Sequence, residues 1–97
     1  MVFNSLSLHD ACLSSAHISW EAARCSLRVY PVGLDAHWLD FEGFTLLELP
    51  RQEPWGPSVS INTVREPKPG CFEIELQSGD VLRIAAVSWS YRAETVA

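Results

Sequence analysis

The segment Gly70-Cys-Phe-Glu-Ile-Glu-Leu-Gln-Ser-Gly-Asp-Val-Leu-Arg-Ile-Ala-Ala-Val87 decides the fold class of this chain. Its apolar residues Phe72 and Ile74 alternate with glutamates, and the turn-forming Ser78-Gly79-Asp80 follows them. A period of two residues is typical of a half-buried strand, because successive side chains of a strand point to opposite faces. The segment therefore predicts a β-hairpin, and the fold class that follows from it is mainly β.

The turn at Ser78-Gly79-Asp80 sets the register of this hairpin. A two-residue turn at Ser78-Gly79 would place Ile74 opposite Arg83, which mixes an apolar side chain with a charged one. A three-residue loop with Gly79 in the left-handed conformation of a β-bulge instead places apolar residues opposite apolar residues and Glu73 opposite Arg83. We therefore expect a bulged hairpin with the pairs Phe72–Ile84, Glu73–Arg83 and Ile74–Leu82.

A second hairpin is indicated by residues 16–29. Ile18 and Trp20 alternate with polar residues, and the alternation resumes at Cys25 after a polar interruption. A four-residue loop over Glu21–Arg24 would place Trp20 opposite Cys25 on an apolar face. A helix here would need an amphipathic run of about ten residues or more, so we expect at most one short helical turn.

Three further segments complete the predicted sheet. Trp38 to Glu42 alternates before Gly43, which we expect at a bulge or bend, and Ser58 to Arg65 alternates again. The last stretch, Val81 to Tyr91, has apolar residues on both sides, which indicates a central or wrapped strand. In total we expect about six antiparallel strands in a strongly curved sheet or a small open barrel.

Length and composition predict one domain over residues 1–97. Apolar residues make up 47% of the chain, which is the composition of a globular protein rather than of a disordered one. With 12 acidic and 7 basic residues the formal charge is −5, so neither a nucleic acid nor a membrane is an expected partner. No apolar stretch reaches the roughly 20 residues that a membrane-spanning helix needs.

The number and spacing of the cysteines indicate the cellular compartment. Cys12, Cys25 and Cys71 are odd in number and lack the dense spacing of a disulfide scaffold, which favours a reducing, cytoplasmic location. Residues 1–8 lack the basic and apolar regions of a secretion signal, so we expect the mature chain to begin here.

The run His9-Asp10-Ala11-Cys12 brings an imidazole, a carboxylate and a thiol together in the sequence. In an extended strand His9 and Cys12 would point to opposite faces, so they would converge only across a turn. We expect His9 and Asp10 to be structural and to hydrogen-bond the backbone where the first strand begins. Because zinc, phosphate-loop, esterase and dinucleotide motifs are missing, we expect no metal, no cofactor and no catalytic residue.

Asp40 and Glu42 lie two residues apart on a predicted strand and therefore share one of its faces. Two such carboxylates could bind a hard cation or act as a general acid and base. The sequence around them is not a calcium-binding loop. We therefore expect them to form an exposed, solvated face.

The loop Arg51-Gln-Glu-Pro-Trp-Gly-Pro57 is the clearest candidate for a contact site. Prolines on both sides of Trp55 restrict the backbone, and Trp and Arg are the residue types that dominate interface energetics. Arg51 and Trp55 are therefore expected to contact a partner or ligand, unless Trp55 folds back to close one end of the sheet. Further candidates, for a covered face or a subunit interface, are Trp38, Trp89 and Tyr91.

Three short motifs carry a resemblance to known proteins. His9-Asp10, Trp55-Gly56-Pro57-Ser58 and Gln77-Ser78-Gly79-Asp80 resemble a loose group of small uncharacterised bacterial β-rich proteins, some of which are similar to immunity proteins of polymorphic toxin systems. The resemblance covers nearly the whole chain. It implies a non-catalytic protein-binding module that binds a cognate toxin, and the acidity of the chain would steer a basic partner toward it.

Three alternatives are considered. A hydrolase would use His9 or His17 and would need that histidine in a cleft beside a carboxylate or a thiol, which we do not expect. A small-molecule-binding β domain would use a pocket inside the curved sheet, lined by Trp20, Trp38 or Trp55. A large cavity with converging polar groups would favour this alternative over a protein partner. A homodimer would form through an exposed strand edge or through the aromatic patch at Trp89 and Tyr91.

Overall fold

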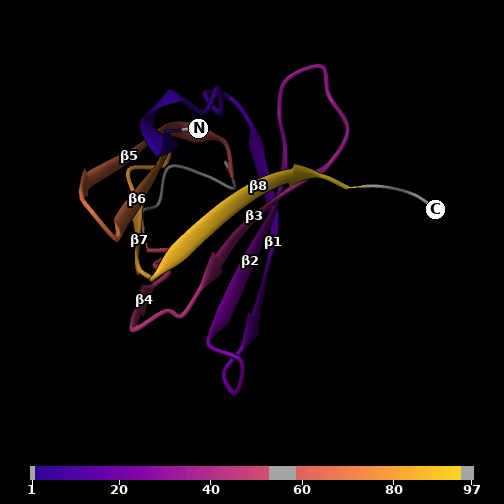
Figure 1. Cartoon of the computed structure of the whole chain (residues 1–97). Helices are drawn as coiled ribbons and strands as arrows, with labels where there is room; N and C mark the ends of the chain where they lie inside the picture. Colours follow the sequence, from indigo (N-terminus) through magenta and orange to yellow (C-terminus); the bar gives the residue numbers. More distant parts are fainter. Residues whose placement is uncertain (1, 53–58, 95–97) are drawn as a thin grey trace.

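Two four-stranded antiparallel sheets, packed face to face, make up the computed structural model, which describes residues 2–52 and 59–94 (Figure 1). The helical structure within these residues is one 3₁₀ turn, η1 (Phe3–Ser5). The strands are β1 (Cys12–Ser19), β2 (Arg24–Tyr30), β3 (His37–Glu42), β4 (Leu46–Glu48), β5 (Ile61–Lys68), β6 (Cys71–Leu76), β7 (Val81–Ala85) and β8 (Ser88–Ala93).

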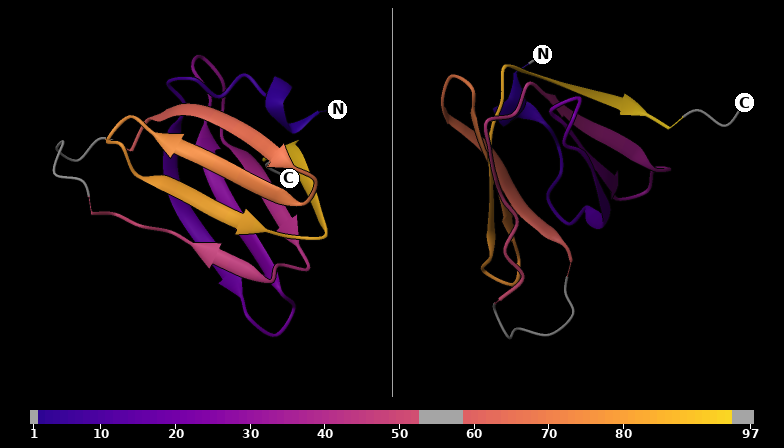
Figure 2. Two further views of the ribbon diagram at one scale, coloured as in Figure 1. Left: turned by 90° about the vertical axis from the view of Figure 1, so that its left-hand side faces the viewer. Right: turned by 90° about the horizontal axis from the view of Figure 1, so that it is seen from below.

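The first sheet has the order β1-β2-β3-β8, and the second has the order β4-β7-β6-β5. Figure 2 shows the two layers and the place of β8 beside β3, at one edge of the first sheet. At one end the layers are hydrogen-bonded to each other, because the Asp10 amide donates to the Ile61 carbonyl and the Ile61 amide donates to the Ala11 carbonyl. The sheets do not close into a barrel. The mainly β, antiparallel class is confirmed. Within residues 2–52 and 59–94, eight strands in two sheets replace the predicted arrangement of about six strands in a strongly curved sheet or a small open barrel.

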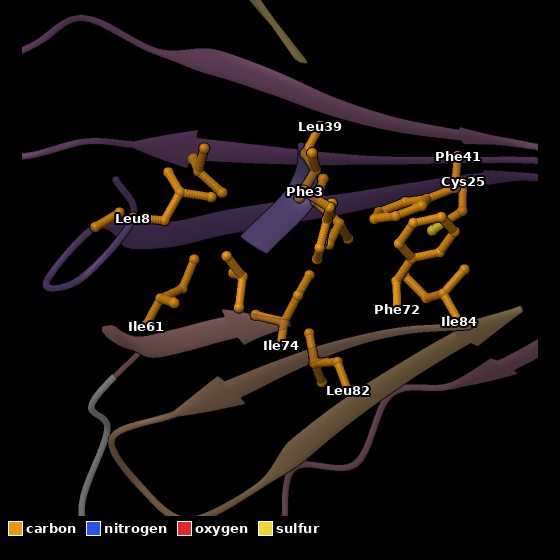
Figure 3. Close-up of a cluster of buried hydrophobic side chains, with 14 of the residues drawn as sticks. Phe3, Leu8, Cys25, Leu39, Phe41, Ile61, Phe72, Ile74, Leu82 and Ile84 are labelled. Carbon is orange, nitrogen blue, oxygen red and sulfur yellow. The ribbon is translucent and has the colours of Figure 1, made fainter. Parts of the chain in front are cut away.

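The hydrophobic core lies between the two sheets (Figure 3). Phe3, carried by η1, is fully buried and makes edge-on or tilted ring contacts with Phe41, Phe72 and Trp89, at centroid distances of 4.9 to 6.0 Å. The N-terminal segment therefore supplies a side chain that contacts residues of both sheets. The other fully buried large apolar side chains among the described residues are Leu8, Leu27, Val29, Leu39, Phe41, Ile61, Ile74 and Ile84.

The hairpin of β6 and β7 has the predicted register. Ile74 lies opposite Leu82, Phe72 opposite Ile84, and Glu73 opposite Arg83. The three-residue loop is closed by the Leu76 amide, which donates to the Asp80 carbonyl, and Gly79 has a φ of 101°. The bulged turn with a left-handed glycine is confirmed.

The hairpin of β1 and β2 differs from the predicted register by two residues. Its turn covers Trp20–Ala23 instead of Glu21–Arg24, and Ile18 lies opposite Cys25. The Ala23 amide donates to the Trp20 carbonyl, and Ala23 has a φ of 52°. Trp20 therefore leaves the strand, remains 82% exposed, and packs edge-on against Phe44. A shift of two residues keeps every side chain on its predicted face, so alternation alone could not choose between the two registers.

The stretch predicted as one strand from Val81 to Tyr91 is two strands in different sheets. The chain leaves the second sheet after β7, passes through Ala86 and Val87, and enters the first sheet as β8. Leu82 faces the core from one layer and Trp89 packs against it from the other. The predicted central position holds for β7, which lies between β4 and β6, whereas β8 is an edge strand of the other sheet. The apolar residues on both sides of this stretch therefore reflect both the internal position of β7 and the change of sheet after it.

Gly43 lies where the chain crosses between the layers in the opposite direction, from β3 to β4. It has a φ of 67°, and the Val87 amide donates to the carbonyl of the preceding Glu42. A Cβ atom on Gly43 would lie 2.8 Å from Cγ2 of Val87. The predicted bend at Gly43 is thus the point where two crossing segments touch.

In the parts of the chain that the structure describes, no helix has the length and apolar character required to span a membrane.

Replacement of Gly79 by Val tests the bulged turn. We expect Gly79→Val to lower the free energy of unfolding by about 2 to 3 kcal/mol, because a β-branched residue is strained at positive φ. Gly79→Asn is the matched control and should lose less, since Asn tolerates the left-handed region better than Val does. Urea denaturation of the three proteins measures both effects. Equal stability of the wild type and the Val variant would contradict the assigned turn.

Candidate functional site

The outer face of the first sheet carries polar side chains from all four of its strands. The register places them in three rows that run across the strands, because every second residue of a strand points away from the core. The central row is His17, Ser26, Asp40 and Ser90. The flanking rows are Ser15, Arg28, Trp38 and Arg92 on one side, and Ser19, Arg24, Glu42 and Ser88 on the other.

A groove follows from this arrangement. The central row has short side chains at Ser26 and Asp40, whereas Trp38 and Arg92 stand beside it on one side and Arg24 on the other. The groove has a volume of about 370 Å³. We call it the outer-face groove, and its lining residues are His17, Ile18, Ser19, Arg24, Ser26, Trp38 and Arg92.

Asp40 lies under the floor of the groove and is only 1% exposed. Its carboxylate accepts a hydrogen bond of 2.6 Å from the Ser26 hydroxyl and one of 2.9 Å from Nε of Arg92. Nη2 of Arg24 lies 3.8 Å from the same carboxylate. The expectation of a solvated face is wrong for Asp40, because long side chains on the neighbouring strands cover it. It holds for Glu42, which is exposed.

Trp38 forms one wall of the groove and is held from three sides. Its indole Nε1 donates to Glu94 at 3.0 Å, and its ring meets the His17 ring edge-on at a centroid distance of 5.2 Å. The guanidinium of Arg92 lies over the same ring, 5.8 Å from its centroid. Because these contacts restrict the indole before any ligand arrives, Trp38 would lose little conformational entropy on binding.

Glu94 anchors Trp38 through a second interaction, with Arg28. The Arg28 guanidinium donates two hydrogen bonds to the Glu94 carboxylate, at 2.9 and 2.8 Å. These bonds, with the one from Trp38, hold the pKa of Glu94 below its ordinary value, although partial desolvation opposes them. The same pair raises the pKa of Arg28. Near neutral pH both groups are therefore charged, and the contact that positions the indole is intact.

The other predicted contact residues lie elsewhere. Trp89 and Tyr91 point to the inner side of β8 and pack against the core. Trp89 meets Phe3 edge-on, Tyr91 stacks on His37 at 5.0 Å, and burial raises the pKa of Tyr91. Arg51 is exposed outside the groove, and Trp55 lies outside the described residues. Of the five predicted contact residues, the structure places Trp38 in the groove.

The sequence did not predict that His17, Arg24 and Arg92 line one groove. His17 was assigned to the polar face of the hairpin of residues 16–29 and to the hydrolase alternative, and Arg24 was placed in the loop of that hairpin. Arg92 reaches the groove because β8 pairs with β3, more than 50 positions earlier in the chain. Alternation assigns each of these residues to a face, but it does not show which strands are neighbours.

His9 and Asp10 connect the beginning of β1 to β5. Nδ1–H of His9 donates to the Asn62 carbonyl at 2.7 Å, and the carboxylate of Asp10 accepts a hydrogen bond from the Gln77 amide. Asp10 itself has a φ of 66°. Through these contacts His9 and Asp10 hold the beginning of β1 against β5 and Gln77. Within residues 2–52 and 59–94 no cluster of three or more His, Cys, Asp or Glu side chains is arranged to hold a metal ion.

The three cysteines are free thiols, and Cys25 is the buried one. Burial, with a smaller contribution from the charge of Asp40, raises the pKa of Cys25 to about 11. The thiol is therefore protonated and unreactive near neutral pH.

A second hollow, of about 450 Å³, lies at the end of the sandwich. The N-terminal segment, the loop after β2 and the beginning of β5 form its walls. Val32 and Leu34 border it and are largely exposed. It lacks charged lysine, arginine and carboxylate side chains in its lining, so its chemistry is less specific than that of the outer-face groove.

No protein-family model, no curated protein and no solved structure matches the chain.

Replacement of Asp40 tests how much the buried carboxylate stabilises the groove. We expect Asp40→Ala to lower the free energy of unfolding by about 2 kcal/mol or more, because Ser26 and Arg92 lose their acceptor. Glu42→Ala, on the same face of the same strand but exposed, should change it by less than about 0.5 kcal/mol. Chemical denaturation measures both. Similar losses in the two variants would contradict the placement of Asp40.

The Glu94 carboxylate makes a pH-dependent contribution to stability. Its pKa is lower in the folded protein than the ordinary value of 4.5, so its contribution is present above that value. It is lost as the pH falls through the lower folded-state pKa. We expect the free energy of unfolding to decline less steeply below about pH 4.5 in Glu94→Gln than in the wild type. Arg28→Gln removes the main cause of the shift and should flatten the acid limb in the same way; identical acid limbs in all three proteins would contradict the assignment.

Proposed function

We propose that the chain is a non-catalytic binding protein that contacts another protein through the outer-face groove. The observation that carries the proposal is the restrained indole of Trp38, which lines one groove together with Arg24 and Arg92. Tryptophan and arginine are the residue types most enriched among the side chains that dominate binding energy. A side chain already held in place loses less entropy on association, so Trp38 meets the requirement for an anchor.

The shape of the site supports a macromolecular partner. The groove is open along the face of a sheet, and one of its ends lies at β1, the edge strand of the first sheet. There Ile18 is almost half exposed, and Trp20 extends from the adjacent turn. Apolar side chains therefore continue beyond the arginines toward an open strand edge, which offers a larger contact area than a small ligand needs.

The charge distribution favours a basic partner at long range. The outer face carries three arginines, Arg24, Arg28 and Arg92, and three carboxylates, Asp40, Glu42 and Glu94, so it is balanced. The net charge of −5 consequently comes from the rest of the chain. Such a field would accelerate the approach of a basic protein without needing direct contacts. A cognate bacterial toxin, captured in the cytoplasm, is the partner that the resemblance to immunity proteins implies.

A small molecule in the same groove is the second candidate function. The volume of about 370 Å³ and the donors that converge on it from Arg24 and Arg92 favour this candidate. We place this candidate in the outer-face groove rather than in a pocket inside the sheet, because side chains of the hydrophobic core lie between the two layers. Trp38 lines the groove from outside, and Trp20 lies at a hairpin turn.

Affinity capture from the bacterium that makes the protein tests the proposal. The bait is the full chain, as wild type, as Trp38→Ala, and as Arg83→Ala from the outer face of the second sheet. We expect a basic protein to bind the wild type and the Arg83 variant, and binding to Trp38→Ala to be about tenfold weaker or more. Higher salt should slow association.

Two results would contradict the proposed function. One is recovery of the chain alone, as a self-associated species in sedimentation. The other is a captured protein whose affinity is the same for the wild type and Trp38→Ala.

A further inference from the structure

The lining of the outer-face groove is cationic. Its charged side chains are the guanidinium groups of Arg24 and Arg92, and His17 adds a titratable imidazole. Their nearest shared counter-charge, Asp40, is beneath the floor and closed off from solvent. A molecule that enters the groove therefore meets two positive groups at the surface and one negative group below them.

The two guanidinium groups keep hydrogen-bond donors for a ligand. A guanidinium has five N–H donors, and the bond from Arg92 to Asp40 uses Nε alone. In the described part of the chain Arg24 has only ion pairs, at 3.8 Å to Asp40 and 3.9 Å to Glu42, and both exceed hydrogen-bond distance. The Nη groups of both arginines are thus free to turn toward an acceptor in the groove.

The charge balance selects a monoanion. Two guanidinium groups face one buried carboxylate, which leaves one positive charge to be matched at the surface of the groove. Glu42 can offset part of it, but Glu42 is exposed and does not line the groove. A dianion would introduce a second negative charge near Asp40, and the repulsion would be strong because that carboxylate is shielded from water.

Apolar surface next to the arginines fits the carbon atoms of such a ligand. Trp38 and Ile18 belong to the same lining, and the Trp38 ring already lies against Arg92. A carboxylate on a short aliphatic stem could accept hydrogen bonds from both arginines while its methylene groups lie on the indole.

We propose that the outer-face groove binds a carboxylate of the protein partner, an aspartate or glutamate side chain or a C-terminal carboxylate, between Arg24 and Arg92. This inference rests on the proposed function and names the group that the groove recognises. It is compatible with a basic partner, because steering depends on the net charge of that protein and recognition depends on the one carboxylate that it places in the groove.

Matched peptides test the inference on the full chain. The probes are Ac-Ala-Glu-Ala-NH₂ and Ac-Ala-Gln-Ala-NH₂, which differ in charge but hardly in size, together with inorganic phosphate. Binding is followed through the NMR shifts of the Trp38 indole N–H and the arginine Nε–H groups. We expect a Kd on the order of 1 to 10 mM for the Glu peptide and one at least about tenfold higher for the Gln peptide. Phosphate should bind more weakly than the Glu peptide, and added salt should weaken the Glu peptide.

Arg24→Gln is the decisive variant, because the Arg24 side chain makes no hydrogen bond within the described residues and its loss should leave the fold intact. It should reduce affinity for the Glu peptide to nearly that for the Gln peptide. Arg83→Gln is the matched control: Arg83 is 50% exposed, Arg24 is 45% exposed, and Arg83 forms ion pairs with Glu48 and Glu73 on the other sheet. The control should bind like the wild type, and thermal unfolding confirms that each variant is folded.

Several outcomes would overturn the inference. These are equal affinity for the two peptides, no shift with either at about ten times the expected Kd, unchanged selectivity in Arg24→Gln, or phosphate bound more tightly than the Glu peptide. The same experiments distinguish failure of this inference from failure of the proposed function. If binding of a captured protein depends on Trp38 but not on Arg24, the proposed function stands and carboxylate recognition is refuted. If the Glu peptide binds selectively but no protein partner is captured, carboxylate recognition stands, the proposed function is refuted, and a small carboxylate ligand is favoured.

Discussion

The structure depends on the packing of Phe3 and Phe72 against Phe41 of β3. These rings join the N-terminal turn and both sheets in one buried cluster, so they fix which side of β3 faces inward. Once Phe41 and Leu39 are buried, the pleat of the strand obliges Trp38 and Asp40 to project from the opposite side. The groove is therefore a consequence of the core, because the buried side chains of β3 determine where Trp38 and Asp40 project.

Sequence reasoning succeeded where a local pattern had one consistent solution. In the hairpin of β6 and β7 the bulged turn pairs like with like, and the structure has this register. It failed at β1 and β2, because a shift of two residues leaves every face unchanged and the local geometry of the turn decides. It also failed at Val81 to Tyr91, where a single apolar stretch is divided between two layers. Nothing in its alternation marks Ala86 and Val87 as the crossing.

The site was less accessible to prediction than the fold. Trp38 was identified as an aromatic residue suited to contact, and Asp40 was placed on the correct face but expected in solvent. Its burial depends on Arg92, which arrives from β8 through a pairing over some 50 residues of chain. Long-range strand order of this kind is not encoded in periodicity. The groove could therefore be recognised only after the strands were in place.

The late position of β8 in the chain has a consequence for synthesis on the ribosome. All the other strands emerge before it, so β3 has an unoccupied side until residues 88–93 are free to pair. During that interval the carboxylate of Asp40 lacks Arg92, and the backbone of β3 can associate with a foreign strand. The outer-face groove would therefore be completed only after β8 has emerged, and translation products that end before β8 would lack the groove and be prone to aggregate.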